Sequence, residues 1–406
     1  MSQSPLITEL KIEGFKSFGT PAERLSLGRL NFVVGANASG KTNLISALRF
    51  IKNAVLQNIE FAVNEFGGVA EVRNKILREK TQPKPITISL KMETDIGGGY
   101  NQTDFRISNF SYTLCLDLRN ESGVPEVASE EFTASLKMSG DKKSLYSLRR
   151  NKHEVEINDP MNKDTSRSYK VPEQEATRLA LGVGFFSIPP VIFRSVIEDW
   201  RFYNISPHLA RTPFKETPDV DLGPAGENLA VILHKLEQQN GKGALHSIIA
   251  GLKSAIPGFK GIKAMQLPVE GKWAFQLLEE KIRGAINPDS ASDGTIRLLA
   301  LMVIANWTTK QSSLVAIEEP ENGVHPHLSE HIVQVLRTAS EERQLLVTTH
   351  NPAFLDYLQP DEVILCDKIN GFTQVQLASN IRGIETFRKH FRLGELWEQG
   401  TLGGIP

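Results

Sequence analysis

The chain has 406 residues, of which 40% are hydrophobic, and its formal net charge is −1. This length allows a large buried core in two or three domains or in one interrupted domain, and the near-zero charge argues against a generally basic nucleic-acid binder. The two cysteines lie far apart, no apolar run is as long as a membrane span, and residues 1–5 do not resemble a signal peptide. We therefore expect a cytoplasmic protein without membrane contact or a cysteine metal cluster.

The first elements in chain order are two expected strands and a helix. Residues 6–18 alternate between apolar and polar side chains, as a half-buried strand does, and residues 29–34 form a second, apolar strand. Apolar side chains at helical spacing predict a helix from Lys41 to about Leu56. The segment between the second strand and this helix matches the P-loop pattern G-x-x-x-x-G-K-[ST].

The P-loop pattern predicts a phosphate-binding turn. It begins at Gly35 and ends in Gly40, Lys41 and Thr42. Side chains at the glycine positions would block the approach of phosphates to the backbone N–H groups of the turn. Lys41 is expected to place its charge on the β- and γ-phosphate oxygens, and the Thr42 hydroxyl is expected to bind Mg²⁺.

Beyond the helix, three stretches alternate as strands do, at residues 86–92, 105–118 and 130–138. They predict an antiparallel sheet beside the nucleotide core. Residues 139–171 are polar and charged, and we interpret them as an exposed hairpin or mobile insertion. Their cations also allow a basic finger that contacts nucleic acid, with a solvated loop as the plainer alternative. These cations are Lys142, Lys143, Arg149, Arg150, Lys152 and Lys163.

The stretch from residue 172 to 260 is expected to be mostly helical. Residues 228–237 and 244–255 carry apolar side chains at i, i+3 and i+4. The sequence has no long heptad array here, which excludes an extended coiled-coil arm. Residues 259–282 return to strand-like alternation and predict a hairpin.

Two carboxylates, Glu318 and Glu319, follow an apolar strand at residues 314–317. A strand buried on both faces presents its last residues at the carboxyl edge of the sheet, beside the P-loop. Glu318 is expected to bind Mg²⁺ through water, and Glu319 to polarise the attacking water as general base. The alternative is a solvated carboxylate pair at a strand end.

Two further positions point to phosphate chemistry. His350 follows the apolar strand at residues 345–349, so we expect it at the same sheet edge, where an imidazole reaches a γ-phosphate oxygen. Ser292 and Gly294 lie just before an apolar helix, whose free N–H groups and macrodipole attract anions. A structural histidine and an ordinary helix N-cap are the respective alternatives.

Together these motifs carry a resemblance. Their order resembles the ATPase heads of the ABC class, and within that class the SMC/RecF branch and its short members, predicted AAA-type ATPases related to overcoming-lysogenization-defect proteins. The segments that carry the resemblance are the P-loop with Asn37, the opening Ile-Glu-Gly-Phe-Lys-Ser-Phe at 12–18, the signature at 292–295, Ile-Glu-Glu-Pro-Glu-Asn-Gly-Val-His-Pro at 317–326, Thr-Thr-His-Asn-Pro at 348–352 and the ending at 393–404.

The resemblance covers residues 1–95 and 260–406. It implies an α/β fold, namely an ABC-type P-loop NTPase head with a mixed or parallel central sheet, an antiparallel β-subdomain and an inserted helical region. We expect ATPase lobe I at 1–138, a polar insertion and helical region at 139–260, and ATPase lobe II at 261–406.

The resemblance also implies a site shared between two subunits of a head-to-tail homodimer, which holds two ATP molecules with Mg²⁺ between them. Catalysis falls to Lys41, Glu319 and His350, and Mg²⁺ binding to Thr42 and Glu318. The nucleotide-binding residues are Gly35, Asn37, Ser39, Gly40, Lys41, Thr42 and Asn43, with Ser292 and Gly294 supplied by the other subunit. A higher oligomer and direct contact with DNA stay open.

Two positions depart from the family pattern. Glu318 stands where the family more often has aspartate, so we expect a longer or water-mediated contact with Mg²⁺. Asp293 replaces the first glycine of the usual signature and puts a negative charge near a phosphate, which weakens dimer closure unless a nearby cation compensates. Short members of the branch often carry an acid there, so we do not expect it to abolish binding.

Two expected groups have only candidate positions. The family uses a glutamine of the first lobe to sense Mg²⁺, and Gln57 and Gln82 are the candidates. Lys11 or Lys16 is expected on the adenine or ribose side of the nucleotide. A solvated lysine on a strand is the alternative for each.

The preferred hypothesis is an ATP-driven switch that serves as the ATPase component of a bacterial anti-phage defence system. Residues 351–406 contain no nuclease-like acidic cluster, so the effector, a nuclease or a toxin, would be another chain. The alternatives are a RecF-like DNA-binding ATPase in DNA repair and an ATP-bound scaffold that scarcely hydrolyses ATP and sequesters a toxin. A transporter subunit is disfavoured because the signature lacks the Leu-Ser-Gly-Gly-Gln form.

Overall fold

The computed structural model describes most of the chain. None of the helices in this described part is long and apolar enough to cross a membrane. Gln82, Lys163 and the side chain of Lys142 lie outside the described part. The described residues are 4–20, 24–77, 84–100, 103–118, 125–138, 142–162, 166–183, 187–216, 218, 221–238, 243–268, 270–307 and 312–403.

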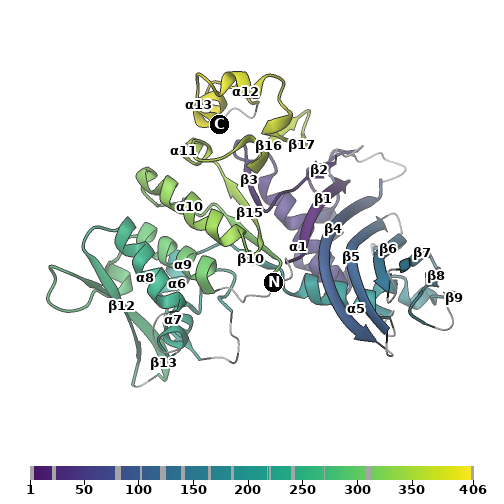
Figure 1. Ribbon diagram of the computed structural model, residues 1–406, viewed down its shortest axis with the longest axis horizontal. Coiled ribbons are helices and arrows are strands. Elements are labelled where there is room, and N and C mark those ends of the chain that lie inside the picture. Colours follow the sequence, from purple (N-terminus) through teal and green to yellow (C-terminus); the bar gives the residue numbers. More distant parts are fainter. Residues whose placement is uncertain are drawn as a thin grey trace.

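A six-stranded sheet lies at the centre of the molecule (Figure 1). Its strand order is β10-β14-β15-β3-β16-β17, and every neighbouring pair is parallel except β16 and β17. The expected mixed, mainly parallel central sheet is therefore confirmed. Its strands are β3 (Leu30–Val34), β10 (Arg201–Tyr203), β14 (Leu314–Glu318), β15 (Gln344–Thr349), β16 (Val363–Ile369) and β17 (Phe372–Leu377).

The inner strands of this sheet are apolar on both faces because helices cover both sides. Along β3, Phe32 and Val34 enter the core that contains α9 and α10, whereas Val33 enters the core that contains α1. The helix predicted from Lys41 to about Leu56 is α1, with those bounds. The three helices span α1 (Lys41–Leu56), α9 (Asp293–Trp307) and α10 (Ser329–Ser340).

A second, eight-stranded antiparallel sheet shares the core that contains α1. Its order is β2-β1-β4-β5-β6-β7-β8-β9, and the three strands expected between residues 86 and 138 are β4, β5 and β6. Phe193 of α5 packs its ring against those of Phe110, Tyr112 and Phe132 on the sheet. The elements are β1 (Leu6–Glu13), β2 (Leu25–Ser26), β4 (Ile86–Tyr100), β5 (Thr103–Asp117), β6 (Glu126–Met138), β7 (Lys142–Asn151), β8 (Glu154–Asn158), β9 (Ser166–Lys170) and α5 (Ile188–Glu198).

The described part of 139–171 has the strand pairing of a hairpin, one of the two expected forms, but it belongs to the antiparallel sheet and is not a separate insertion. It forms β7, β8 and β9, which continue the sheet by pairing with β6 and with each other. Buried Tyr146, Leu148 and Val155 alternate with less buried and mostly polar neighbours, so a low apolar content concealed a sheet with one buried face. The domain boundary expected after residue 138 consequently separates two paired strands.

The basic finger also fails at one of its cations. Arg150 is 2% exposed, and its guanidinium donates hydrogen bonds to the backbone carbonyls of Lys152, Ala176 and Arg178. A cation held in this way joins β7 to the segment before α4 and is not available to a phosphate backbone. Lys143, Arg149 and Lys152 remain on the strands and the turn of the sheet.

The helical side of the molecule lies at the opposite end from the antiparallel sheet (Figure 1). The helices expected at 228–237 and 244–255 are α7 and α8, and the expected hairpin at 259–282 is β12 and β13, so these predictions are confirmed. α8 packs against α9. The elements are α6 (Pro207–Arg211), β11 (Phe214–Lys215), α7 (Leu229–Gln238), α8 (Ala244–Ala255), β12 (Phe259–Gln266) and β13 (Lys272–Glu279).

Short helices complete the described chain. The last residues form a cap over β3, β16 and β17, in which Leu396, Trp397 and Leu402 are buried. These helices are α2 (Ile59–Glu65), α3 (Val69–Val72), α4 (Ala180–Val183), α11 (Pro352–Leu355), α12 (Ile384–Phe387) and α13 (Leu393–Glu398).

Candidate functional site

The turn between β3 and α1 needs glycine at two positions. A Cβ atom on Gly35 would overlap the carbonyl oxygen of Cys366 in the neighbouring strand β16. Gly40 has a φ of 114°, and a Cβ atom there would overlap the hydroxyl of Thr373. Glycine at both positions lets the turn pack closely at the N-terminus of α1, where free N–H groups favour an anion.

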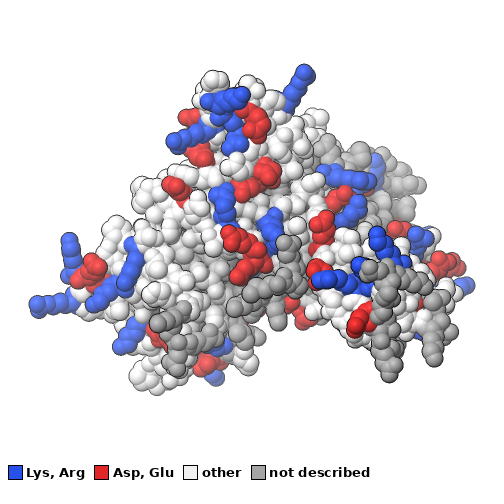
Figure 2. All heavy atoms as spheres, in the orientation of Figure 1, with Lys and Arg blue, Asp and Glu red and all other residues white. Residues whose placement is uncertain are grey.

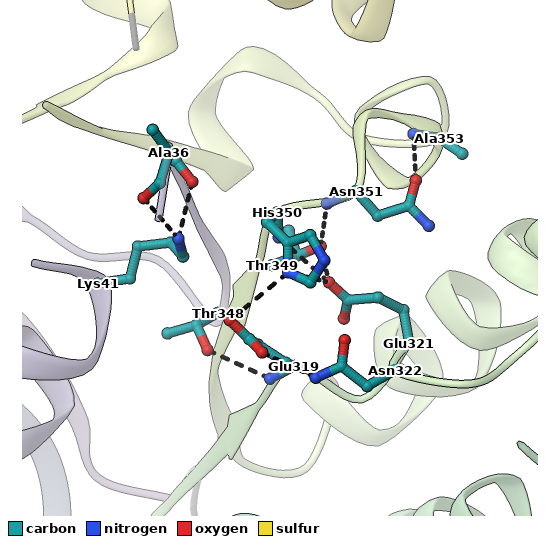
Figure 3. A network of polar contacts seen from close by, with 11 residues as sticks. Ala36, Lys41, Glu319, Glu321, Asn322, Thr348, Thr349, His350, Asn351 and Ala353 are labelled. Carbon is teal, nitrogen blue, oxygen red and sulfur yellow. Dashed lines mark hydrogen bonds and ion pairs between the residues drawn. The ribbon is translucent and has the colours of Figure 1, made fainter. Parts of the chain in front are cut away.

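Lys41 lies inside this turn (Figure 3). Its ammonium donates hydrogen bonds to the carbonyl oxygens of Gly35, at 2.7 Å, and Ala36, at 2.9 Å, and the residue is 5% exposed. Burial lowers the pKa of Lys41, and the nearby carboxylates of Glu319 and Glu321 act in the opposite direction. The turn thus holds a cation that faces the carboxylates at the end of β14.

The other P-loop residues divide into two groups. Asn37 and Thr42 are exposed at the rim of the turn. Ser39 is buried, and its carbonyl accepts a hydrogen bond from Thr373 at 2.7 Å. The Asn43 amide donates to the Ser17 hydroxyl at 2.6 Å. Asn37 and Thr42 therefore face outward, while Ser39 and Asn43 hold the turn in place.

Glu318 and Thr42 lie together, as the expected Mg²⁺ site requires. Burial raises the pKa of Glu318 above its ordinary value, while the charge of Arg49 and a hydrogen bond with Thr42 act in the opposite direction. The Arg49 guanidinium lies 3.7 Å from the carboxylate. Sequence reasoning missed Arg49, although it follows Thr42 by two turns on the same face of α1.

Glu319 and His350 meet where β14 and β15 end, since the two strands are parallel neighbours in register. His350 Nδ1 lies 3.5 Å from Glu319 Oε1, and the Asn322 amide donates to Glu319 Oε2 at 2.8 Å (Figure 3). Glu319 has a φ of 43°, which is unusual for a residue other than glycine, and its N–H donates to the Thr348 carbonyl at 3.0 Å. The backbone thereby turns the carboxylate toward His350.

Glu321 is a third carboxylate that sequence reasoning did not select. Its side chain accepts hydrogen bonds from the Thr349 hydroxyl, at 2.5 Å, and the His350 N–H, at 3.1 Å. It is 6% exposed, burial raises its pKa, and its Oε2 has no hydrogen-bond partner among the residues that the structure describes. Glu321 fixes the backbone that carries His350, and its place two residues after the carboxylate pair was the signal for it.

The signature segment forms a separate surface. Ser292 Oγ accepts a hydrogen bond from the Thr295 N–H at 3.1 Å and so caps α9. A Cβ atom on Gly294 would overlap the carbonyl oxygen of Gly323, so the turn after β14 packs directly on this glycine. Ser292 is exposed, and within the described residues no hydrogen bond or ion pair joins it or Gly294 to the P-loop turn. The structure thus leaves the two halves of the expected site apart within one chain.

The remaining candidates, Lys11, Lys16 and Gln57, have different surroundings. Lys11 pairs with Glu13 on β1, 2.9 Å away. Lys16 lies over the Phe66 ring and lines a cleft of about 380 Å³ that also contains Ser17 and Asn43. Gln57 follows the last residue of α1, about 24 Å along the helix axis from Lys41 at the helix start, so it lies too far away to sense Mg²⁺ there.

Solved structures of Smc head domains are similar to this chain. The chain is similar to the Smc head bound to the C-winged helix domain of ScpA, with 12% identity, a TM-score of 0.51, and coverage of 91% of this chain and 97% of that chain. It is also similar to the Smc head domain with an extended coiled coil bound to the C-terminal domain of ScpA, derived from Pyrococcus furiosus, with 13% identity, a TM-score of 0.53, and coverage of 95% and 99%. The likeness at these identities concerns the fold.

The fold and the P-loop architecture define an SMC-like ABC/AAA ATPase head. Residues 30–356 match the family described as "AAA domain, putative AbiEii toxin, Type IV TA system". The chain belongs to that family. No curated protein matches the sequence significantly.

Proposed function

We propose that the protein binds and hydrolyses ATP with Mg²⁺ and that ATP closes it into a head-to-tail homodimer with two ATP molecules at the interface. The observation that carries the proposal is the meeting of Lys41, the Thr42–Glu318 pair and the Glu319–His350 pair at one sheet edge. The cation and hydroxyl suit a triphosphate with its metal, and the carboxylate suits water activation.

The residues divide the work as follows. Thr42 and Glu318 would hold Mg²⁺, which supplies charge neutralisation on the phosphate oxygens when bound. Glu319 would accept the proton of the attacking water, and the Asn322 amide keeps its carboxylate in one orientation. His350 would donate to a γ-phosphate oxygen, since Glu321 already holds its backbone.

The cleft beside the P-loop would take the base and ribose. It adjoins Asn43, so it lies on the α1 side of the turn, and its wall includes the Phe66 ring and Lys16. The Lys16 ammonium lies over the Phe66 ring, so the cation and not the ring face would contact the nucleotide. Lys16 is accordingly the candidate for the contact expected from Lys11 or Lys16.

The dimer is proposed because the signature is exposed and apart from the P-loop of its own chain. Ser292 and Gly294 present a capped helix N-terminus, a surface that attracts anions. In a head-to-tail pair this surface would meet the triphosphate on the P-loop of the partner. Each subunit would then complete the other's site.

Turnover and association of two variants test this proposal. Glu319→Gln keeps the size of the side chain but removes the base, so ATP turnover is expected to fall at least about a hundredfold while ATP-bound dimers accumulate. Turnover would be measured by phosphate release and association by sedimentation velocity. A Glu319→Gln protein that stays monomeric in saturating ATP, or that hydrolyses as fast as the parent, would refute the proposal.

The finer proposal is that the dimer switches a separate effector, a nuclease or toxin, in anti-phage defence. The family description names a toxin system, and the described residues contain no group of three or more His, Cys, Asp or Glu side chains placed to hold a metal ion. We propose that this effector is a second chain. Co-expression with the product of the adjacent gene, followed by comparison of the complex with and without ATP, tests this idea.

Two alternatives stay open. A RecF-like ATPase in DNA repair would show steeply salt-dependent DNA binding by the isolated protein; the burial of Arg150 weakens this reading, and acidic and basic side chains are interspersed on the face seen in Figure 2. An ATP-bound scaffold that sequesters a toxin would lose little turnover in Glu319→Gln, because the parent would have little.

A further inference from the structure

The signature at 292–295 contains a negatively charged side chain, although its proposed task is to bind a phosphate. Asp293 lies between Ser292 and Gly294, and its side chain is 67% exposed. A carboxylate at this place repels a triphosphate that approaches the N-terminus of α9. A helix N-terminus itself favours an anion, so the Asp293 carboxylate also neutralises part of the positive potential that would attract the phosphate.

Arg211, the last residue of α6, is placed to counter this charge. Its Nη2 lies 2.7 Å from Asp293 Oδ1, and its side chain is only 13% exposed. The same guanidinium donates hydrogen bonds to the backbone carbonyls of Pro288 and Ala291, both at 2.9 Å. Arg211 therefore holds the backbone just before the signature and the carboxylate within it.

The two partners of the Arg211–Asp293 ion pair differ in exposure and in their other contacts, and this difference indicates a role for Arg211. Asp293 sits on the exposed side, whereas Arg211 is anchored by carbonyls and cannot swing out easily. Arg297, one turn further along α9, interacts electrostatically with Asp293 but also with Glu319 and Glu321. Arg211 is thus the cation in direct contact with the carboxylate, while the charge of Arg297 is shared with the carboxylates after β14.

We infer that Arg211 is a positioning residue of the signature: it neutralises the Asp293 carboxylate and turns it aside, so that Ser292 and Gly294 can receive the triphosphate bound to the partner. This inference rests on the proposed ATP-bound dimer. It assigns to α6, which carries none of the expected site residues, control over how tightly the dimer closes.

A purely structural brace would look the same in the static structure but respond differently to substitution. If Arg211 acts through Asp293, removal of the carboxylate makes the arginine dispensable. If Arg211 only supports the carbonyls of Pro288 and Ala291, removal of the carboxylate changes nothing. A double-mutant cycle between positions 211 and 293 distinguishes these cases.

The experiment uses the full chain in the Glu319→Gln background with saturating ATP and Mg²⁺, and measures the dimer dissociation constant by sedimentation velocity. Arg211→Ala is expected to weaken dimerisation about tenfold, because an exposed carboxylate is left beside a phosphate. Adding Asp293→Gly is expected to restore the parent value within about twofold, and Asp293→Gly alone to close at least as tightly as the parent. Raising the salt concentration should shrink the tenfold loss.

Arg337→Ala is the matched control. Arg337 also donates to a carboxylate, that of Glu362 at 2.6 Å, and to a backbone carbonyl, that of Tyr357 at 3.1 Å, but it lies on α10 away from the signature. Its loss should leave the dimer dissociation constant unchanged. Circular dichroism of each variant checks that it is folded.

The outcomes separate the two proposals. The parent of these variants is the Glu319→Gln protein. If it stays monomeric in ATP, both the proposed function and this inference are refuted. A parent that dimerises, together with a double variant as weak as Arg211→Ala, overturns the inference alone and leaves Arg211 a structural brace. If Arg211→Ala does not fold, Asp293→Gly by itself decides, because a weakened dimer would show that the carboxylate assists closure.

Discussion

Two regions of this molecule bury charged side chains, and they treat them in opposite ways. In the antiparallel sheet, the fully buried Glu130 carboxylate accepts hydrogen bonds from the Tyr112 hydroxyl, at 3.1 Å, and from the N–H groups of Ala180, at 2.6 Å, and Leu181, at 3.2 Å. Its cross-strand neighbour Arg150 donates to three backbone carbonyls. These groups satisfy one another within the chain.

At the carboxyl edge of the central sheet, the polar groups are left incomplete and the backbone is strained. Glu321 Oε2 is buried and has no hydrogen-bond partner in the described part of the chain, and Ala38 and Glu319 have φ values of 63° and 43°. Such positions cost free energy and persist where function requires them. The Glu130 cluster is therefore a structural connection between the sheet and α4, whereas the strain and the unpaired carboxylate oxygen at the P-loop edge support the proposal that this edge binds a ligand.

The largest expected effect comes from Lys41→Ala, which should lower ATP turnover about a thousandfold because the phosphate oxygens lose their cation. Lys52→Ala is the matched control. Lys52 is also on α1 and also donates to two backbone carbonyls, those of Glu198 and Trp200. It should cost stability but not turnover per folded molecule. Equal losses of turnover in Lys41→Ala and Lys52→Ala would contradict a special functional role for the P-loop edge.

The second prediction addresses the structural region. Glu130→Ala leaves three buried donors and a buried arginine without their carboxylate, so the free energy of unfolding should fall by about 3 kcal/mol. Urea unfolding followed by circular dichroism measures it. Glu131→Ala, on the exposed face of the same strand, should change stability by less than about 0.5 kcal/mol. A Glu130→Ala protein of parental stability would contradict the structural role.

The third prediction concerns the carboxylate that sequence reasoning missed. Glu321→Ala removes the acceptor for the Thr349 hydroxyl and the His350 N–H, so His350 loses its fixed position and kcat should fall about tenfold with a smaller change in KM. Steady-state ATP turnover measures both constants. Glu330→Ala, exposed on α10, serves as the control. A loss confined to KM would place Glu321 in nucleotide binding instead.

The last prediction concerns Cys366, whose side chain takes no part in the proposed chemistry and whose backbone carbonyl packs against Gly35. Burial raises the pKa of its thiol from 9.0 to about 11, so the thiolate fraction at pH 8 is about a hundredfold lower than for an ordinary thiol. Iodoacetamide should therefore label Cys366 at least about a hundredfold more slowly in the native protein than in urea. Peptide mass spectrometry over time measures the rates. Rapid native labelling would show that this edge opens in solution.

Local patterns in the sequence predicted much of the fold. The bounds of α1 and α8, the strands β3, β14 and β15, and the β12–β13 hairpin follow from apolar spacing, since each element buries one stripe or both faces. The same reasoning failed for β7 to β9, whose buried positions are few and whose exposed face is charged. Arg150 looked like a surface cation for that reason, although its carbonyl partners bury it.

The candidate site shows the same division. The P-loop, Glu318, Glu319 and His350 belong to short motifs whose spacing is set by a strand, a turn and a helix, so the sequence alone places each of them at the end of a strand or the start of a helix. Arg49 and Arg211 belong to no such motif, and Glu321 lies in the motif at 317–326 but was not selected from the sequence. Their roles depend on which carboxylate, hydroxyl or carbonyl the folded chain brings within reach.

The sequence by itself determined the P-loop, the parallel strands that end beside it and the membership of a nucleotide-binding class, because these depend on residues close together along the chain. Only the tertiary structure decided that β7 to β9 join the sheet, that Arg150 is buried, and that Arg211 pairs with Asp293. Hydrogen bonds and ion pairs act over a few ångströms in space, and the chain must fold before distant residues come that close.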